Sequence, residues 1–95
     1  MAQVPAKGAR LRLRLYVAGR APNSVRAIAN ARAICAAHFA AGHELEIVDL
    51  LEHPTRGLED GIIVTPTLLR LQPLPARRVI GSLSDTGQVL LALST

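Results

Sequence analysis

The chain offers few residues that could carry out covalent chemistry. Its single cysteine, Cys35, cannot form an intrachain disulfide and falls on the apolar face of a predicted helix. A small thiol in such a place is usually a buried core residue. Ser24 has no histidine or acid nearby in the sequence to activate its hydroxyl, and its position at the start of the same helix predicts a helix cap. We therefore expect no nucleophilic catalyst.

The histidines and acids also lack the spacing of a known site. His38, His43 and His53 are five and ten residues apart, which matches no compact set of metal ligands. Four acids lie around a predicted strand end and helix: Asp49, Glu52, Glu59 and Asp60. Such a group could include a general acid and base but is more often a solvated face. Neither GxGxxG nor a GxxxxGK phosphate-binding loop occurs. We expect no enzyme activity, no metal and no cofactor.

The formal charge of +4 raises the question of nucleic-acid binding. It comes from ten arginines and one lysine against seven acids. The arginines are scattered along the chain, and with one Tyr and one Phe they lack the aromatic residues that single-strand binders place between cations. We therefore expect no nucleic-acid partner.

The 95 residues suffice for one domain with a small aliphatic core. Met1–Ala9 has no apolar period and is expected to be a flexible N-terminal tail, which leaves residues 10–95 as the folded domain. The tail lacks the apolar centre of a signal peptide, and no apolar run reaches the length of a membrane span. We expect a cytoplasmic protein without a membrane contact.

Alternation marks the first strand. Four apolar residues alternate with four others: Leu11, Leu13, Leu15 and Val17 with Arg10, Arg12, Arg14 and Tyr16. This period of two predicts a strand over residues 10–17. Its arginine face is expected to be solvated, or covered by a helix whose polar edge reaches the guanidinium groups.

A helix is predicted next, capped by Asn23 or Ser24 with Pro22 just outside, and running to about Ala41. Gly42 is expected to end it as a left-handed C-cap. The expected apolar face consists of Val25, Ile28, Ala31, Cys35 and Phe39. A second strand over Leu45–Leu51 follows, and a strand–helix–strand crossover of this length implies a parallel pair.

The second half contains shorter elements. Pro54 opens a predicted surface helix that ends at about Gly61. Thr67–Gln72 and Arg77–Ile80 are predicted antiparallel strands joined by the turn Pro73-Leu74-Pro75. Ser84 or Asp85 caps a last segment, Thr86–Leu93, whose leucine-rich pattern fits either a helix or a strand.

The resulting order, βαβαββα, is similar to that of thioredoxin-like α/β proteins. Such folds place a cis proline ahead of a strand, and Thr65-Pro66-Thr67 stands at that point. Redox members of this fold carry a cysteine pair in the loop after the first strand. The corresponding loop, residues 19–24, has no cysteine, so dithiol chemistry is excluded.

Three motifs closely resemble the KaiB family of circadian-clock proteins. They are Leu15–Gly19 followed by Ala21–Ala27, Thr65–Leu68, and Pro75–Ser84, in matching order over about Leu11–Leu93. The resemblance implies a regulatory binding protein that docks on a KaiC-type ATPase and modulates a circadian or hourglass cycle. In full clocks it would also sequester KaiA and displace a KaiB-like kinase sensor domain. The alternative is a KaiB-like sensor or adaptor module acting on a histidine kinase or in a stress-response pathway.

The resemblance also implies a fold switch between a ground-state fold, βαββααβ and usually tetrameric, and a thioredoxin-like monomer. The refolding half would begin near Thr65 and Pro66, and Pro73, Pro75 and the ambiguous last segment fit two packings. Ala92 stands where the family usually has glycine, and alanine favours a helix by about 1 kcal/mol. We expect a bias toward the thioredoxin-like monomer, with a homo-tetramer as the other resting state.

Five positions match residues that the family uses at its partner surfaces. They are Arg26, Asp49, Arg70, Arg77 and Arg78. The four arginines could equally form a solvated basic edge. The second strand is expected to be an exposed edge of the sheet, a usual place for partner contacts between strands.

Overall fold

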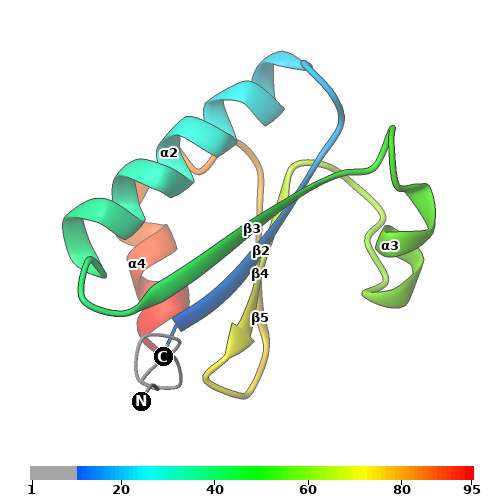
Figure 1. Cartoon of the computed structure of the whole chain (residues 1–95). Coiled ribbons are helices and arrows are strands. Elements are labelled where there is room, and N and C mark those ends of the chain that lie inside the picture. Colours follow the sequence, from blue (N-terminus) through cyan, green and yellow to red (C-terminus); the bar gives the residue numbers. More distant parts are fainter. Residues whose placement is uncertain (1–10) are drawn as a thin grey trace.

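The computed structural model describes residues 11–95 as one α/β unit (Figure 1). Its elements are β2 (Leu11–Val17), α2 (Pro22–His38), β3 (His43–Asp49), α3 (Pro54–Glu59), β4 (Thr67–Gln72), β5 (Arg77–Ile80) and α4 (Thr86–Ser94). The predicted order βαβαββα is confirmed, and the last segment is a helix. The predicted N-terminal tail, Met1–Ala9, and Arg10 lie outside the described residues.

The four strands form one sheet in the order β3-β2-β4-β5. β2 pairs in parallel with β3, from Leu11 opposite His43 to Val17 opposite Asp49, as the crossover predicted. β4 runs antiparallel to both β2 and β5. β3 is therefore an edge strand, as expected. α2 and α4 cover one face of the sheet, and α3 lies against the other (Figure 1).

The core lies between the sheet and the helices α2 and α4. The apolar positions of β2 all point into it, together with Ala27, Ala31, Ile34 and Cys35 of α2, Leu68 and Val79 of the sheet, and Val89 and Leu93 of α4. Cys35 is 1% exposed, which confirms a buried thiol, and this burial raises the pKa of the thiol. Val25 is half exposed, so its predicted place on the buried face is wrong. The helical period places Ser24 there instead.

Both predicted ends of α2 are wrong. Pro22 is the first helical residue, where its missing N–H costs nothing, and no side chain caps the helix. The Ser24 hydroxyl instead accepts a hydrogen bond from the Ala18 N–H at 3.0 Å. The helix stops at His38 rather than Ala41, and Gly42 has an ordinary φ. A turn closed by the Gly42 N–H on the Phe39 carbonyl at 3.1 Å leads directly into β3.

β3 begins and ends two residues before the predicted Leu45–Leu51, because that turn delivers the chain to the sheet at His43. The two following strands have the predicted bounds, and α3 ends at Glu59, close to the predicted Gly61. The Thr65–Pro66 peptide bond is cis, at the position where thioredoxin-like folds place a cis proline, and the Gln72–Pro73 and Leu74–Pro75 bonds are cis as well. Pro73 and Pro75 lie in the turn between β4 and β5, so neither removes a hydrogen bond from the sheet.

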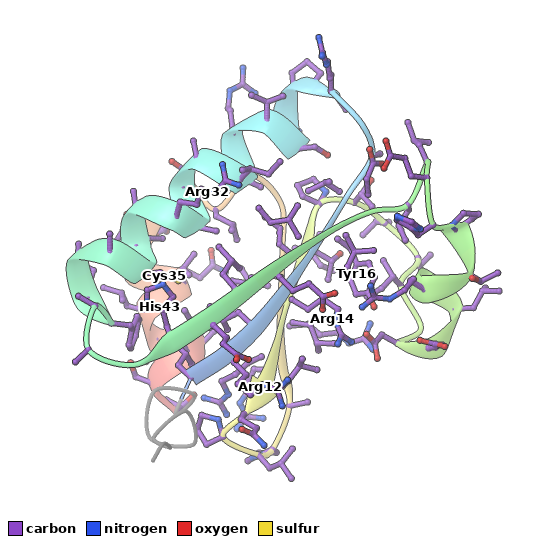
Figure 2. The ribbon with its side chains drawn as sticks, viewed as in Figure 1. Arg12, Arg14, Tyr16, Arg32, Cys35 and His43 are labelled. Carbon is purple, nitrogen blue, oxygen red and sulfur yellow. The ribbon has the colours of Figure 1, made fainter. Side chains whose placement is uncertain are left out.

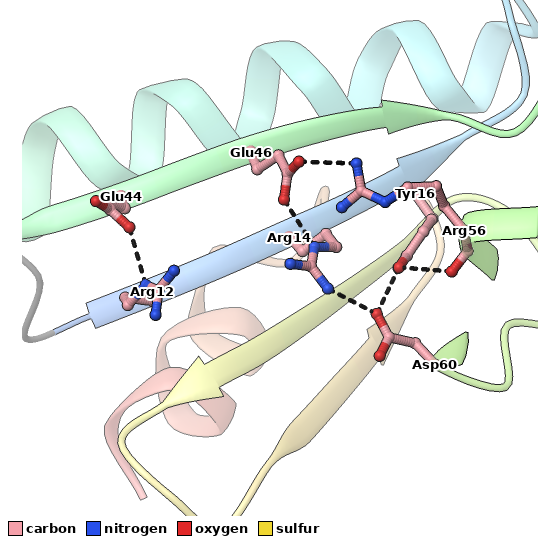
Figure 3. Close-up of polar contacts among 7 residues, drawn as sticks. All are labelled: Arg12, Arg14, Tyr16, Glu44, Glu46, Arg56 and Asp60. Atoms are coloured by element: carbon pink, nitrogen blue, oxygen red, sulfur yellow. Dashed lines mark hydrogen bonds and ion pairs between the residues drawn. The ribbon is translucent and has the colours of Figure 1, made fainter. Parts of the chain in front are cut away.

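The second face of β2 carries arginines paired with glutamates of β3 (Figure 3). The Arg12 guanidinium donates to Glu44 at 2.9 Å, and that of Arg14 donates to Glu46 at 2.8 Å. Arg12 lies where no helix covers the sheet, so its pair is solvated, whereas Arg14 also reaches Asp60 of the α3 region at 2.9 Å. Each of the two expected environments of the arginine face is therefore found, the solvated one at Arg12 and the helix-covered one at Arg14.

α3 is fixed to this face by Tyr16 and Arg14. The fully buried Tyr16 hydroxyl donates to the Asp60 carboxylate and lies 3.1 Å from the Arg56 carbonyl oxygen (Figure 3). The Arg56 guanidinium lies 3.0 Å from Glu46. Figure 2 shows Arg14 and Tyr16 reaching from β2 toward α3. A short helix with two polar anchors thus covers one end of the sheet.

These contacts change the acidity of the groups involved. Hydrogen bonds from Arg56 and Arg14 lower the pKa of Glu46 to about 2. Burial alone would raise the pKa of Asp60, but the hydrogen bonds from Tyr16 and Arg14 outweigh it and hold that pKa below its usual value. The pKa of Tyr16 is raised, first by burial and then by Asp60. Both carboxylates therefore stabilise the fold in their ionised form.

We predict a loss of stability in acid that depends on Glu46. Its contribution is complete above pH 4.5, the ordinary pKa of the group, and is lost as the pH falls toward 2. Because Glu46 is half exposed, Glu46→Gln should lower the free energy of unfolding at pH 7 by only about 0.5–1 kcal/mol. Urea unfolding should show a difference that vanishes near pH 2. Glu52→Gln, at an exposed position, is the control, and equal effects of both variants would contradict the assignment.

Candidate partner-binding surface

One end of the sheet gathers exposed apolar side chains. The register places the loop after β2, the loop after β3 and the segment before β4 at this end, because Val17 pairs with Asp49 and Tyr16 with Thr67. Of the eight large apolar side chains exposed by the described residues, Ile80 of β5 lies at this end because it pairs with Thr67, and so do four others in the loops and in α2: Val25, Leu51, Ile63 and Val64. We call these four residues and Gly19 the sheet-end surface. Exposed apolar side chains that gather in this way indicate a binding surface.

Asp49 holds two loops of this surface together. Its Oδ1 accepts hydrogen bonds from the Gly19 N–H and the Leu51 N–H, each at 2.9 Å. Gly19 has φ +54°, and a Cβ there would lie 2.7 Å from the Leu51 side chain, so Leu51 rests directly on the glycine backbone. Asp49, a predicted partner residue, is half-buried and determines where Leu51, 72% exposed, presents its side chain.

The Thr65–Pro66 step determines how Ile63 and Val64 are presented. Pro66 and Thr67 are buried, the Gly81 N–H donates to the Pro66 carbonyl at 3.0 Å, and the Thr67 hydroxyl donates to the Val64 carbonyl at 2.7 Å. Ile63, just before this anchored step, is 93% exposed. The sequence pattern gave no sign of its exposure, because an apolar run before a strand is usually part of the core.

The three exposed arginines among the predicted partner residues do not form one cluster. Arg26 lies on the outer side of α2, one residue after Val25, and donates to the Asn23 side chain at 2.8 Å. Arg78 donates to the carbonyls of Gly61, at 3.1 Å, and Asp60, so it fixes the chain after α3. Arg77 is exposed beside the Pro73–Pro75 turn, at the far end of the sheet.

Arg70 does not lie on the surface, and its predicted place there is wrong in this fold. It is 1% exposed because it pairs with Leu13 in the sheet and points to the same side as the core. Its guanidinium donates to the carbonyl oxygens of Pro75 at 2.7 Å, Leu93 at 3.1 Å and Ala92 at 3.2 Å. Ala92 is half-buried in α4.

The surface offers contacts rather than reactive groups. Within residues 11–95 no three His, Cys, Asp or Glu side chains come together as metal ligands would. His43 contacts the Phe39 carbonyl at 2.8 Å, while His38 and His53 are exposed. Among the described helices, none has the length and apolar character that crossing a bilayer requires. The sheet-end surface itself presents exposed apolar side chains, of the kind found at contacts with other molecules.

Comparison of the sequence with known proteins identifies a family. The KaiB domain family model matches residues 14–95. The circadian clock oscillator protein KaiB of Synechococcus elongatus is 47% identical over 81 residues, which cover 85% of this chain and 79% of that protein. KaiB of Prochlorococcus marinus is 46% identical and covered over 69% of its length. Both relatives are named as oscillator proteins of a circadian clock.

Solved structures extend the likeness to the fold. The N-terminal domain of Synechococcus elongatus SasA matches with a TM-score of 0.70 and 25% identity, covering 85% of this chain and 78% of that domain. Fasciola hepatica thioredoxin matches with a TM-score of 0.74 at 11% identity, covering 96% and 85%. The predicted thioredoxin-like fold is thus confirmed. From the family match over residues 14–95 and the relatives at 47% identity, the chain belongs to the KaiB family of circadian-clock proteins.

Proposed function

We propose that this protein is a cytoplasmic, non-catalytic regulator that docks on a KaiC-type ATPase and modulates a circadian or hourglass timing cycle. The observation that carries the proposal is the family relation to clock oscillator proteins across 85% of the chain. The exposed sheet-end surface supports it, because a regulator without reactive groups must act through contact. Arg26, Asp49, Arg77 and Arg78 remain the proposed partner residues, Asp49 acting through the loops that it holds.

The docking contact is centred on the sheet-end surface. The side chains of Leu51 and Ile63 are already exposed, so a partner can bury their large apolar area without any refolding of this chain. Burying one such side chain contributes about 1.5–3 kcal/mol to the free energy of binding. Arg26 borders this surface and supplies a charge. The outer edge of β3 adds a second contact, since its seven residues contain no proline or glycine, whereas β5 has four residues between Pro75 and Gly81. KaiA is a proposed further partner at this edge.

A second candidate function is a sensor or adaptor role acting on a histidine kinase or in a stress-response pathway. The likeness to the SasA N-terminal domain, with a TM-score of 0.70, favours it. The same surface would serve both functions, so binding experiments with each class of partner distinguish them.

We also propose that the half of the chain from Thr65 onward refolds between the observed fold and the βαββααβ fold. The observed fold is the thioredoxin-like state, in which α4 is a helix. Support comes from the composition of α4, whose leucine-rich pattern also suits a strand. A fold switch requires two such packings of similar free energy. Thr65, Pro66, Pro73, Pro75 and Ala92 are the proposed switch residues, and the resting state is a monomer or a homo-tetramer.

Ile63→Asp should weaken binding to a KaiC-type ATPase in the presence of nucleotide at least tenfold, since it places a charge in the apolar contact. Biolayer interferometry would measure the dissociation constant. Leu74→Asp is the matched control, because Leu74 is also an exposed apolar residue, 77% exposed, but lies in the turn at the far end of the sheet. A loss of affinity with Leu74→Asp and none with Ile63→Asp would contradict the placement of the binding surface.

Arg26→Glu should reduce the association rate and the affinity about three- to tenfold, with an effect that fades at high salt, because a charge at the border of an interface acts mainly on association. Arg32→Glu introduces the same change on an exposed position of the same helix, farther from the sheet end. Stopped-flow binding at two salt concentrations compares them. Equal effects of the two variants would show that only net charge matters.

Ala92→Gly should shift the population toward the alternative fold, since glycine weakens α4 by about 1 kcal/mol, or about fivefold in the equilibrium. Circular dichroism together with light scattering would follow the two folds. Ala33→Gly, at an exposed position of α2, controls for helix weakening outside the refolding half. Identical spectra and masses for the wild type and Ala92→Gly would count against the switch.

A further inference from the structure

Arg70 is the only fully buried charged side chain among residues 11–95. It points from β4 toward α4, and no described carboxylate lies within ion-pair distance of it. Its partners are backbone carbonyl oxygens alone, and its Nε is buried without any partner. A buried cation without a counter-ion is costly, so the carbonyls around it must compensate.

The carbonyls that Arg70 binds are of a particular kind. Those of Ala92 and Leu93 belong to the last turn of α4, where the helix itself supplies no N–H partners and the helix dipole places partial negative charge. The third belongs to Pro75, in the turn between β4 and β5. One guanidinium therefore closes the C-terminal end of α4 and ties it to the sheet and to the turn.

α4 has few other attachments. Among the described residues, those of Arg70 are the only side-chain hydrogen bonds that join α4 to the rest of the chain, since Asp85 caps the helix locally through the Gln88 N–H. Only Val89 and Leu93 are fully buried, and Leu91 is exposed. The link to β5 contains Gly81 at φ +115° and Leu83 at φ +64°, a left-handed conformation that is unfavourable for leucine.

We infer that the hydrogen bonds of Arg70 hold α4 against the sheet. When they break and form again, α4 detaches from the core and docks again as one unit, with Gly81–Leu83 as the hinge. Opening returns the guanidinium to water, which offsets part of the loss of the Val89 and Leu93 contacts. The device operates in the isolated chain and does not depend on any partner. Arg70 is thus a positioning residue whose effect is confined to α4 and the turn.

Cys35 provides a built-in probe of this opening. It lies on α2 (Figure 2), is 1% exposed, and belongs to the same buried cluster as Val89 and Leu93. Because it is the only cysteine of the chain, its reaction with an aromatic disulfide reagent reports on a single site. Removal of α4 from the cluster exposes the thiol, whereas the docked helix protects it.

The test compares the wild type with Arg70→Met, Arg70→Lys and the control Arg12→Met. Arg12 is an arginine of the same sheet whose ion pair with Glu44 lies on the opposite, solvated face. Labelling of Cys35 by dithionitrobenzoate and hydrogen exchange of residues 86–95 are measured in native buffer. We expect Arg70→Met to raise the rate of Cys35 labelling and the rate of hydrogen exchange in α4 about tenfold or more, because hydrogen bonds to a charged group are lost. Arg70→Lys should give rates between those of Arg70→Met and the wild type, and Arg12→Met should give the rates of the wild type.

Two results with Arg70→Met would contradict this role of Arg70. Labelling and α4 exchange of Arg70→Met within twofold of the wild type would show that Arg70 does not hold the helix. Equal losses of protection in β2 and α4 would show that the residue stabilises the whole fold instead. The wild type alone also tests the inference, because its α4 amides must exchange faster than those of β2. Equal protection of the two elements would contradict a separately opening helix.

Discussion

The two-sided chemistry of β2 is the constraint on which the rest of the molecule depends. This strand lies between β3 and β4, with leucines and a valine on one face and Arg12, Arg14 and Tyr16 on the other. A slip of one residue in its pairing would exchange the faces and bury two cations in the aliphatic core. The alternation therefore assigns α2 and α4 to one side and α3 to the other.

From this arrangement the sheet-end surface follows. Arg14 and Tyr16 hold Asp60, Arg78 holds the carbonyls of the same segment, and the Ile62 N–H donates to the Gly57 carbonyl at 2.8 Å. These polar contacts fix the chain that leads from α3 to Ile63. The opposite loop is held by Asp49 on Gly19 and Leu51. Apolar side chains thus stay exposed because rigid backbone prevents them from folding back into the core.

Much of the fold could be predicted from local patterns. Alternation identified β2, Pro54 marked the start of α3, prolines marked the turn between β4 and β5, and the length of the crossover implied the parallel pair. The ends of α2 could not be predicted in this way. The alanine-rich segment after His38 favours a helix, but the turn that leads into β3 overrides that propensity, and Ser24 bonds the preceding strand end instead of capping the helix.

The candidate site was less accessible to sequence reasoning. The motifs identified the family, and Asp49 was among the predicted residues, but its contacts with Gly19 and Leu51 depend on loops from separate elements. Arg70 illustrates the opposite error, because an arginine in a strand is expected to face solvent until the sheet register places it beneath α4. The exposure of Ile63 likewise depends on how the chain after α3 meets the sheet, which no local pattern encodes.

We propose that this thioredoxin-like chain is itself the form that binds a KaiC-type ATPase. Size-exclusion chromatography with light scattering, on the protein alone and freshly mixed with such an ATPase and nucleotide, tests it most directly. The expected result is a monomer that co-elutes with the ATPase without delay. A tetramer that co-elutes only after hours would contradict the claim for the resting state, and the absence of any complex would contradict the proposed function.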